Sequence, residues 1–247
     1  MFTIKSTVTR AAFIQYRKRR VKLQYLCTYF PINLCPDAVS RSLVLFKKNN
    51  PVHVDAWARY AAEAITLPRN CLIVRPLGSQ EQSIRPDAVP DTPLDKLCAR
   101  LASANRCSYA PWLLTKRTRT RPLKGLNRDD RWRTLWDQYR VATPVDTDRI
   151  GCILLVDDII TTGTTFRAII RVLQNAYPKL PVAAFALGRT AVPKMSHETR
   201  KEQRYNEWFC EEIPLLREDT SEYQSPQPTP GELEFPDVDE ADTFISD

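Results

Sequence analysis

Residues 153–165 read ILLVDDIITTGTT, an apolar run followed directly by a cluster of polar side chains. The apolar part belongs to a longer run rich in branched residues, 150–156, which is typical of a central parallel strand covered on both faces. Residues 165–176 then carry apolar side chains at helical spacing. The sequence therefore predicts a strand, a polar loop and a helix in succession, with the polar side chains at the carboxyl end of the strand.

Similar patterns on either side of this unit extend it into an alternating α/β chain. Residues 55–65 and 93–104 carry apolar side chains on one helical face, and residues 71–74 and 182–187 are short apolar runs typical of buried strands. Strands and helices that alternate at these lengths predict right-handed crossovers and a doubly wound, mainly parallel sheet. Ligands of such sheets bind at the carboxyl ends of the strands, where the polar loop lies.

The polar loop combines carboxylates with hydroxyl groups and a glycine. Backbone N–H groups at the start of a helix are unpaired and can hold a phosphate, and a glycine lets the backbone approach that anion. Asp157 and Asp158 repel phosphate, so we expect them to hold ligand hydroxyl groups or a Mg²⁺ ion that bridges to ligand oxygens. A ribose that carries a 5-phosphate meets both requirements. The predicted phosphate-binding residues are Thr161, Thr162, Gly163, Thr164 and Thr165.

The whole stretch resembles the 5-phosphoribosyl-1-pyrophosphate (PRPP) motif of type I phosphoribosyltransferases, in which four apolar residues precede two acids and a Thr/Gly loop. Residues 50–190 also resemble the ComF-like branch of that family, through GLNRDDRW in a long basic segment and VAAFALGRT after the motif helix. The resemblance implies the type I α/β fold with an N-terminal helical hood. It also implies that Asp157 and Asp158 hold the ribose hydroxyl groups and Mg²⁺ and act in catalysis.

Two further segments take candidate roles from the resemblance. It implies that Arg75, Pro76, Leu77 and Gly78 form a pyrophosphate-binding turn, and an ordinary turn after a strand is the alternative. It also implies that the basic part of the chain between residues 105 and 132 is a long, exposed, mobile flap that closes over pyrophosphate. A solvated run of charges is the alternative there. The candidate pyrophosphate-binding residues of the flap are Arg119 and Arg121.

Charge divides the chain into unlike parts. Residues 1–36 contain seven Lys/Arg and no acid, whereas residues 218–247 contain ten Asp/Glu and no Lys or Arg. The net charge of +7 therefore leaves +17 on residues 1–217 once those ten acids are set aside. A strongly basic body favours anionic partners: phosphorylated small molecules, nucleic acid or the acidic tail itself. Organelle transit peptides share the composition of the first 36 residues, which is an alternative interpretation of that segment.

These patterns predict three parts and a compartment. The parts are a basic N-terminal arm and hood (1–50), a phosphoribosyltransferase-like domain (51–217) and a disordered, acidic, proline-rich tail (218–247). Seven cysteines, an odd number without any CxxC pair, argue against a disulfide framework and a zinc site and favour the reducing cytoplasm. No stretch approaches the roughly 20 apolar residues of a membrane span, so we expect no contact with a membrane.

Three hypotheses for function follow. The first is a phosphoribosyltransferase that binds PRPP and Mg²⁺ and transfers ribose 5-phosphate to a nitrogen nucleophile, with release of pyrophosphate. The second is a non-catalytic, PRPP-sensing or nucleic-acid-associated (competence-like) protein whose basic arm contacts phosphates. The third is an interaction module that acts through its acidic tail. The residues identify neither the acceptor, whose pocket Arg189 and Thr190 are candidates to line, nor the assembly, for which a homodimer is one option.

Overall fold

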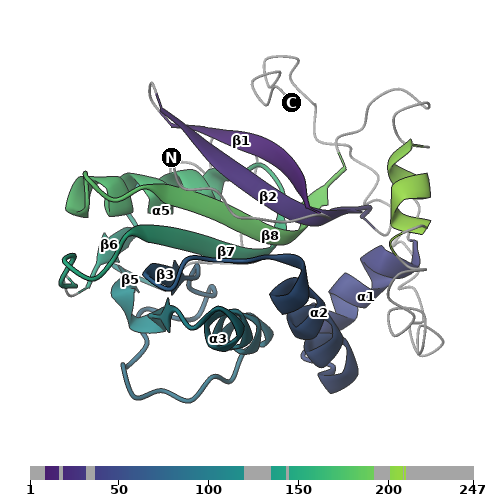
Figure 1. Cartoon of the computed structure of the whole chain (residues 1–247), viewed down its shortest axis with the longest axis horizontal. Coiled ribbons are helices and arrows are strands. Elements are labelled where there is room, and N and C mark those ends of the chain that lie inside the picture. The colour runs from purple at the N-terminus through teal and green to yellow at the C-terminus, as the bar shows by residue number, and fades with distance from the viewer. Residues whose placement is uncertain are drawn as a thin grey trace.

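A six-stranded sheet forms the centre of the molecule (Figure 1). The computed structural model describes residues 9–16, 19–31, 37–119, 135–142, 145–191, 201–207 and 209. The strands stand in the order β1-β2-β8-β7-β3-β4, and all neighbours are parallel except β1 and β2. The predicted α/β fold with a mainly parallel sheet is confirmed.

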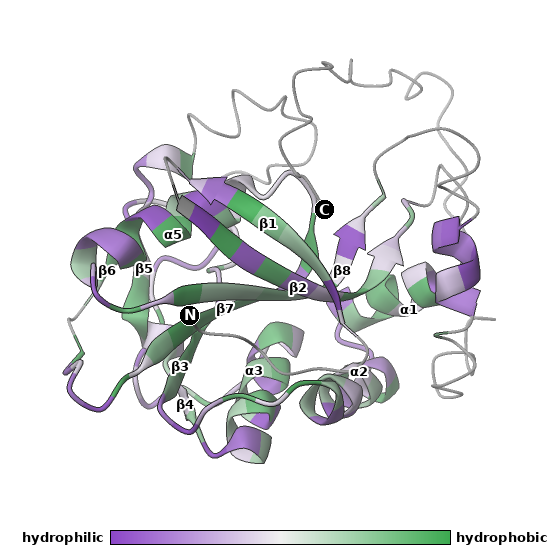
Figure 2. Cartoon of the chain, turned by 45° about the horizontal axis from the view of Figure 1, so that its top comes forward, coloured by the Kyte–Doolittle hydropathy of each residue, from purple (hydrophilic) through white to green (hydrophobic). Residues whose placement is uncertain are grey.

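The motif strand β7 (Cys152–Ile160) lies between β3 (Cys71–Val74) and β8 (Val182–Thr190). Its apolar residues are fully buried, as expected for a strand covered on both faces, and Figure 2 shows this hydrophobic colouring along β7 and β3. The register with β3 ends at Leu155, whereas the register with β8 continues to Ile160. The last residues of β7 are therefore paired on the β8 side only.

Helices cover both faces of the sheet. On one face, α1 (Ala38–Lys47), α2 (Pro51–Ala64) and α3 (Pro93–Asn105) pack against the central strands, and α5 (Thr164–Ala176) packs on the other (Figure 1). The helices predicted at 55–65, 93–104 and 165–176 are confirmed, with ends that move by up to four residues. None of the helices in the described part of the chain is long and apolar enough to cross a membrane.

The N-terminal segment, whose secondary structure the pattern left open, contributes strands. The strands β1 (Arg10–Tyr16) and β2 (Arg19–Tyr29) form an antiparallel hairpin, and β2 pairs in parallel with β8. Ala12, Ile14 and Tyr16 are buried at every second position, which is the period of a half-buried strand. Part of the segment predicted as an arm and hood is therefore built into the main sheet, and α1 and α2 follow it.

Part of the segment predicted as a flap has regular structure. Residues expected to be an exposed loop form β4 (Ser108–Tyr109), the 3₁₀ turn η1 (Pro111–Leu113) and β5 (Leu114–Lys116), which pairs with β6 (Tyr139–Val141). The prediction is wrong for these residues because Leu113 and Leu114 fill the core beneath β3 and hold the chain against it. Arg121 and the other basic residues from 120 to 132 lie outside the described residues.

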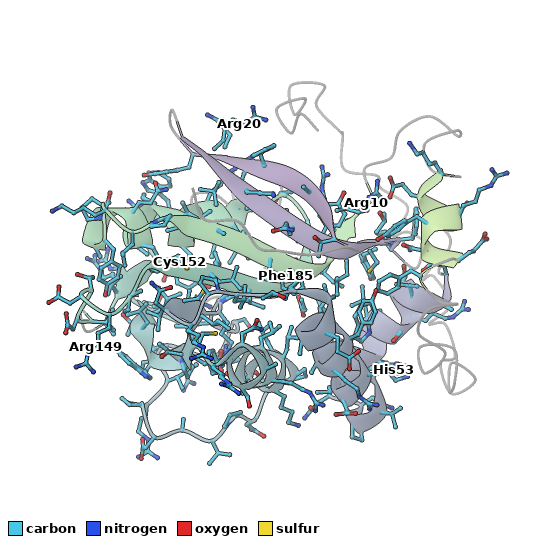
Figure 3. The ribbon with its side chains drawn as sticks, in the orientation of Figure 1. Arg10, Arg20, His53, Arg149, Cys152 and Phe185 are labelled. Carbon is cyan, nitrogen blue, oxygen red and sulfur yellow. The ribbon has the colours of Figure 1, made fainter. Side chains whose placement is uncertain are left out.

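The described chain ends in a helical segment, 201–207, followed by Phe209. Phe209 is fully buried, and its ring packs on those of Trp57 and Tyr60 in α2. Arg10 on β1 reaches the same segment, where its Nη2 donates to Glu202 Oε1 at 2.5 Å (Figure 3). The fold therefore extends at least to Phe209, and the predicted acidic tail, 218–247, lies outside the described residues.

Candidate functional site

Two half-buried carboxylates, Asp157 and Asp158, occupy the part of β7 that extends past β3. The backbone N–H of Asp158 donates to Asp157 Oδ1 at 2.9 Å, and that of Ile159 donates to Asp158 Oδ1 at 2.5 Å. These bonds hold both side chains beside their own strand. Because β3 no longer pairs with β7 here, the two carboxylates face a space that a neighbouring strand would otherwise fill.

That space is a cavity of about 470 Å³, within the usual range for small-molecule sites of roughly 300–1,000 Å³. Its walls come from the end of α1, the turn after β3, the start of α3, β5, β6 and the start of α5. The cavity brings together residues that the sequence proposed for three different parts of one ligand. These are Asp157, Asp158, Thr165, Arg75, Pro76, Leu77 and Gly78.

The loop before α5 is open to an anion. Gly163 has a φ of 69°, in the left-handed region that favours glycine, and α5 has no side-chain cap. By contrast, α1, α2 and α3 are each capped by a side chain, those of Asp37, Asn50 and Thr92. The first N–H groups of α5 are therefore oriented for an acceptor that none of the described side chains supplies as a cap.

The remaining threonines lie around this loop rather than in the cavity. The hydroxyl groups of Thr162 and Thr164 are 2.8 Å apart. Residues 161–163 line a separate, very small hollow of about 10 Å³ together with Arg167 and Arg189. Thr165 is therefore the motif residue of the loop that reaches the main cavity.

Arg75 is buried, and two carboxylates hold its guanidinium. Its Nε and Nη2 donate to Asp95 at 2.5 and 3.0 Å, and its Nη1 and Nη2 donate to Glu81 at 2.7 and 2.8 Å. The second Nη1 hydrogen goes to the carbonyl oxygen of Pro76, at 2.9 Å. Burial opposes ionisation of Glu81 and Asp95, but hydrogen bonds from Arg75 and from neighbouring donors, together with the charge of Arg75, outweigh it and lower the pKa of both carboxyls. Arg75 thus ties the turn to the start of α3.

Two lysines that the sequence did not single out also line the cavity. Lys47, the last residue of α1, places Nζ 3.5 Å from Asp158 Oδ1. Lys116, the last residue of β5, donates from Nζ to the carbonyl oxygen of Gly78 at 2.7 Å. Burial lowers the pKa of Lys116 to about 8. Burial also opposes the charge on Lys47, but Asp158 and Asp157 outweigh it and raise the pKa of Lys47.

The carboxylate pair fits Mg²⁺ that arrives with a ligand. Burial and the neighbouring Asp158 raise the pKa of Asp157 well above its ordinary value, against the opposing effect of Lys47, so the pair favours an added cation or hydrogen-bond donor. Carboxylate oxygens are hard ligands, and Mg²⁺ usually binds one or two of them plus substrate phosphates and water. In the described part of the chain, no three His, Cys, Asp or Glu side chains are grouped to hold a metal by themselves.

The other predicted residues stand apart from the cavity. Arg119 is exposed, at the end of a described segment, and is not among the residues that line the cavity. Arg189 lines the small hollow beside residues 161–163, and its guanidinium lies 5.7 Å from the ring centre of Tyr25. Thr190 is half-buried at the end of β8.

Residues 151–225 match the family model of the phosphoribosyl transferase domain. The match begins at Gly151, immediately before β7, and includes the motif, α5 and β8. It covers 75 of the 247 residues, which is less than half of the chain. No curated protein matches the chain significantly. The phosphoribosyl transferase match and the mainly parallel sheet together support the resemblance to type I phosphoribosyltransferases, while the ComF-like branch stays a prediction.

Proposed function

We propose that the protein binds PRPP with Mg²⁺ and transfers its ribose 5-phosphate to a nitrogen nucleophile, with release of pyrophosphate. The observation that carries this proposal is the single cavity that joins the carboxylate pair Asp157 and Asp158 to the start of α5 and to the turn after β3. Carboxylates and an open helix start need different parts of a ligand, hydroxyl groups and a phosphate. PRPP carries both groups. It also carries a pyrophosphate, for which the turn after β3 is the candidate binding site.

In this reaction the bond from C1 of the ribose to pyrophosphate breaks, and the leaving group takes the electron pair. A bond from C1 to the nucleophile's nitrogen forms, and the nitrogen loses its proton to the leaving pyrophosphate or to water. Asp157 and Asp158 accept hydrogen bonds from the ribose hydroxyl groups, and their charge stabilises the positive charge that develops on the sugar ring. The same two carboxylates would hold Mg²⁺, which would supply positive charge to offset the negative charge of the leaving pyrophosphate.

The remaining contacts fix the ends of the ligand. The 5-phosphate lies at the start of α5, where the uncapped N–H groups and the hydroxyl of Thr165 donate to it. Pyrophosphate lies along the turn formed by residues 76–78. Phe46 of α1 and Leu94 of α3 give the cavity an apolar wall, which suits a flat acceptor ring. Positioning of the two reactants then supplies most of the rate enhancement.

Calorimetry with PRPP and Mg²⁺ tests the proposal. We expect wild type to bind and Asp157→Asn/Asp158→Asn to bind at least about 100-fold more weakly, because two charge-assisted contacts of roughly 1.5–3 kcal/mol each are lost. Asp146→Asn/Asp148→Asn is the matched control, since both residues are exposed and outside the cavity. A wild-type protein that does not bind PRPP would contradict the proposal. Release of pyrophosphate with a panel of nitrogen acceptors then identifies the acceptor.

One observation favours the nucleic-acid-associated alternative. On the surface of the N-terminal hairpin, the guanidinium of the exposed Arg20 lies 4.1 Å from the ring centre of Phe13. Basic side chains that stack on aromatic rings are typical of surfaces that bind single strands. A salt-sensitive shift of single-stranded DNA that Arg20→Ala/Lys22→Ala abolishes, without release of pyrophosphate from PRPP, would support this alternative over the enzyme.

A further inference from the structure

Lys116 lies where the second, two-stranded sheet meets the turn after β3. Its backbone is fixed by pairing with Tyr139 on β6 and by a 2.7 Å bond from its N–H to the carbonyl oxygen of Gln82. The residue is only 6% exposed, and its Nζ crosses to the carbonyl oxygen of Gly78. The side chain therefore joins two walls of the cavity, and its ammonium group is at the point where they meet.

An aromatic ring and two charged side chains lie near this ammonium group. Its Nζ lies 5.5 Å from the ring centre of Tyr139, whose hydroxyl donates to the carbonyl oxygen of Leu77 at 3.3 Å. Among the described residues, Glu81 favours the ammonium form and Arg75 opposes it. Both oxygens of Glu81 already accept hydrogen bonds from Arg75, and one also accepts the N–H of Gly78. Burial outweighs these charges, and the pKa of Lys116 falls to about 8.

Burial makes this charge costly to the fold, and the lowered pKa of Lys116 reflects that cost. The carbonyl oxygen that it contacts belongs to Gly78, which is exposed and can bond water. The turn is already tied to the rest of the chain by Arg75, through Glu81, Asp95 and the carbonyl oxygen of Pro76. A ligand anion in the cavity is the partner that a cation in this position suits best.

We propose that Lys116 is a pyrophosphate-binding residue, which holds the anion against the turn formed by residues 76–78. This inference rests on the proposed function, because it places the pyrophosphate part of PRPP in the same cavity. It also gives Arg75 a different role from the one that the sequence implied. Arg75 positions the turn through two carboxylates, and Lys116 supplies the positive charge that the anion contacts.

The proposal has a consequence for pH dependence. Below pH 8 the free protein carries Lys116 as the ammonium form, and the anion binds without taking up a proton at this site. A bound phosphate favours the charged form and raises the pKa of Lys116 in the complex. Above pH 8, binding must therefore add a proton, and affinity falls by up to about tenfold for each pH unit.

The test compares calorimetry of magnesium pyrophosphate, PRPP and ribose 5-phosphate for three variants. At pH 7.5 we expect Lys116→Met to bind pyrophosphate and PRPP about tenfold or more weakly than wild type, and to bind ribose 5-phosphate within about twofold. The exposed Lys96→Met is the matched control and should bind all three as wild type does. Lys116→Arg keeps its charge throughout, so between pH 7.5 and 9.5 its affinity for pyrophosphate should fall less steeply than that of wild type.

A stability measurement separates this role from a structural one. Because the pKa of Lys116 is lower in the folded protein than in the unfolded chain, its charge disfavours the folded state at pH 7 and ceases to do so as pH rises through 8 to 10.5. Lys116→Met should therefore unfold at a higher urea concentration than wild type at pH 7. If the variant instead fails to fold, the comparison of pH profiles between wild type and Lys116→Arg decides by itself.

The outcomes distinguish the two proposals. Wild-type binding of PRPP together with unchanged pyrophosphate affinity in a folded Lys116→Met overturns the role of Lys116 and leaves the proposed function intact. Identical pH profiles for wild type and Lys116→Arg overturn it as well. If wild type binds neither PRPP nor ribose 5-phosphate at any pH, the proposed function fails and this inference fails with it.

Discussion

At the scale of single residues, Gly163 sets the shape of the loop that precedes α5. Its φ of 69° costs a residue with a side chain about 1–2 kcal/mol, whereas the added methyl group would meet only Ile160 Cδ1, at an ordinary 3.6 Å. The cost is therefore one of backbone conformation and not of a clash. Any residue other than glycine is expected to pull the start of α5 away from the position in which its N–H groups can hold a phosphate.

We predict that Gly163→Ala lowers the free energy of unfolding by about 1–2 kcal/mol and weakens the binding of PRPP. Urea denaturation and calorimetry measure the two effects. Gly163→Asn is the control, because asparagine tolerates the left-handed region better than alanine does. It should lose less stability than the alanine variant in spite of its larger side chain. Equal losses for the two variants would mean that backbone strain is not the cause.

Individual residues also mark the limit of what the sequence could predict about the site. Asp157, Asp158 and Gly163 were identified because the motif is local: a strand, two acids and a helix start in thirteen residues. Lys116 lies 38 residues along the chain from Gly78, whose carbonyl oxygen it contacts. Arg75 and Asp95, which form an ion pair, are 20 residues apart. Neither contact leaves a periodic signal, so the position of Lys116 beside the turn and the ion pairs of Arg75 could be found only in the structure.

At the scale of elements, close packing between β8 and α1 fixes the position of α1 on the sheet. A methyl group on Gly188 of β8 would lie 2.8 Å from Leu43 Cδ1, and Leu43 is fully buried in the core. Since α1 ends at Lys47, beside Asp158, we expect the same contact to affect the distance between α1 and the carboxylate pair. The packing of one glycine therefore links the position of a helix to the width of the cavity.

We predict that Gly188→Ala destabilises the protein by about 1–3 kcal/mol, because overpacking forces Leu43 and α1 to move. Urea denaturation measures the loss. In the double variant Leu43→Ala/Gly188→Ala the methyl group finds room, so the two losses should sum to more than the loss of the double variant. Strict additivity of the two single losses would show that the contact with Leu43 is not responsible.

The elements differ in how well the sequence predicted them, and length and composition explain the difference. The buried strands β3, β7 and β8 contain continuous apolar runs, the helices α2, α3 and α5 have a clear helical period, and their expected positions were confirmed. The strands β5 and β6 have three residues each, too few to show a period. In the hairpin, the partly exposed Phe13 blurs the alternation of β1, and β2 begins with the basic residues Arg19 and Arg20, which hid two strands in what looked like a basic arm.

At the scale of the whole molecule, the described fold and the acidic tail occupy separate parts of the sequence and carry opposite charge. Packing of Phe209 on α2 and the contact between Arg10 and Glu202 tie the chain to the fold as far as residue 209. The ten acids lie beyond residue 217, and the rest of the chain carries +17 without them. A chain that ends at Arg217 should therefore keep its packing while losing the charge that offsets its basic surface.

We predict that truncation after Arg217 changes the free energy of unfolding by less than about 0.5 kcal/mol, whereas truncation after Ala191 also removes the buried Phe209 and costs about 3–5 kcal/mol or more.

Binding of single-stranded DNA by the chain that ends at Arg217 should strengthen, and most at low salt, because repulsion between the tail and phosphate is gone. Electrophoretic shifts across a salt series measure this. The full-length chain with all ten tail acids changed to Asn or Gln should behave as the truncated chain does, since the effect is one of charge. Equal DNA binding with and without the acidic residues would show that the tail does not screen the basic body.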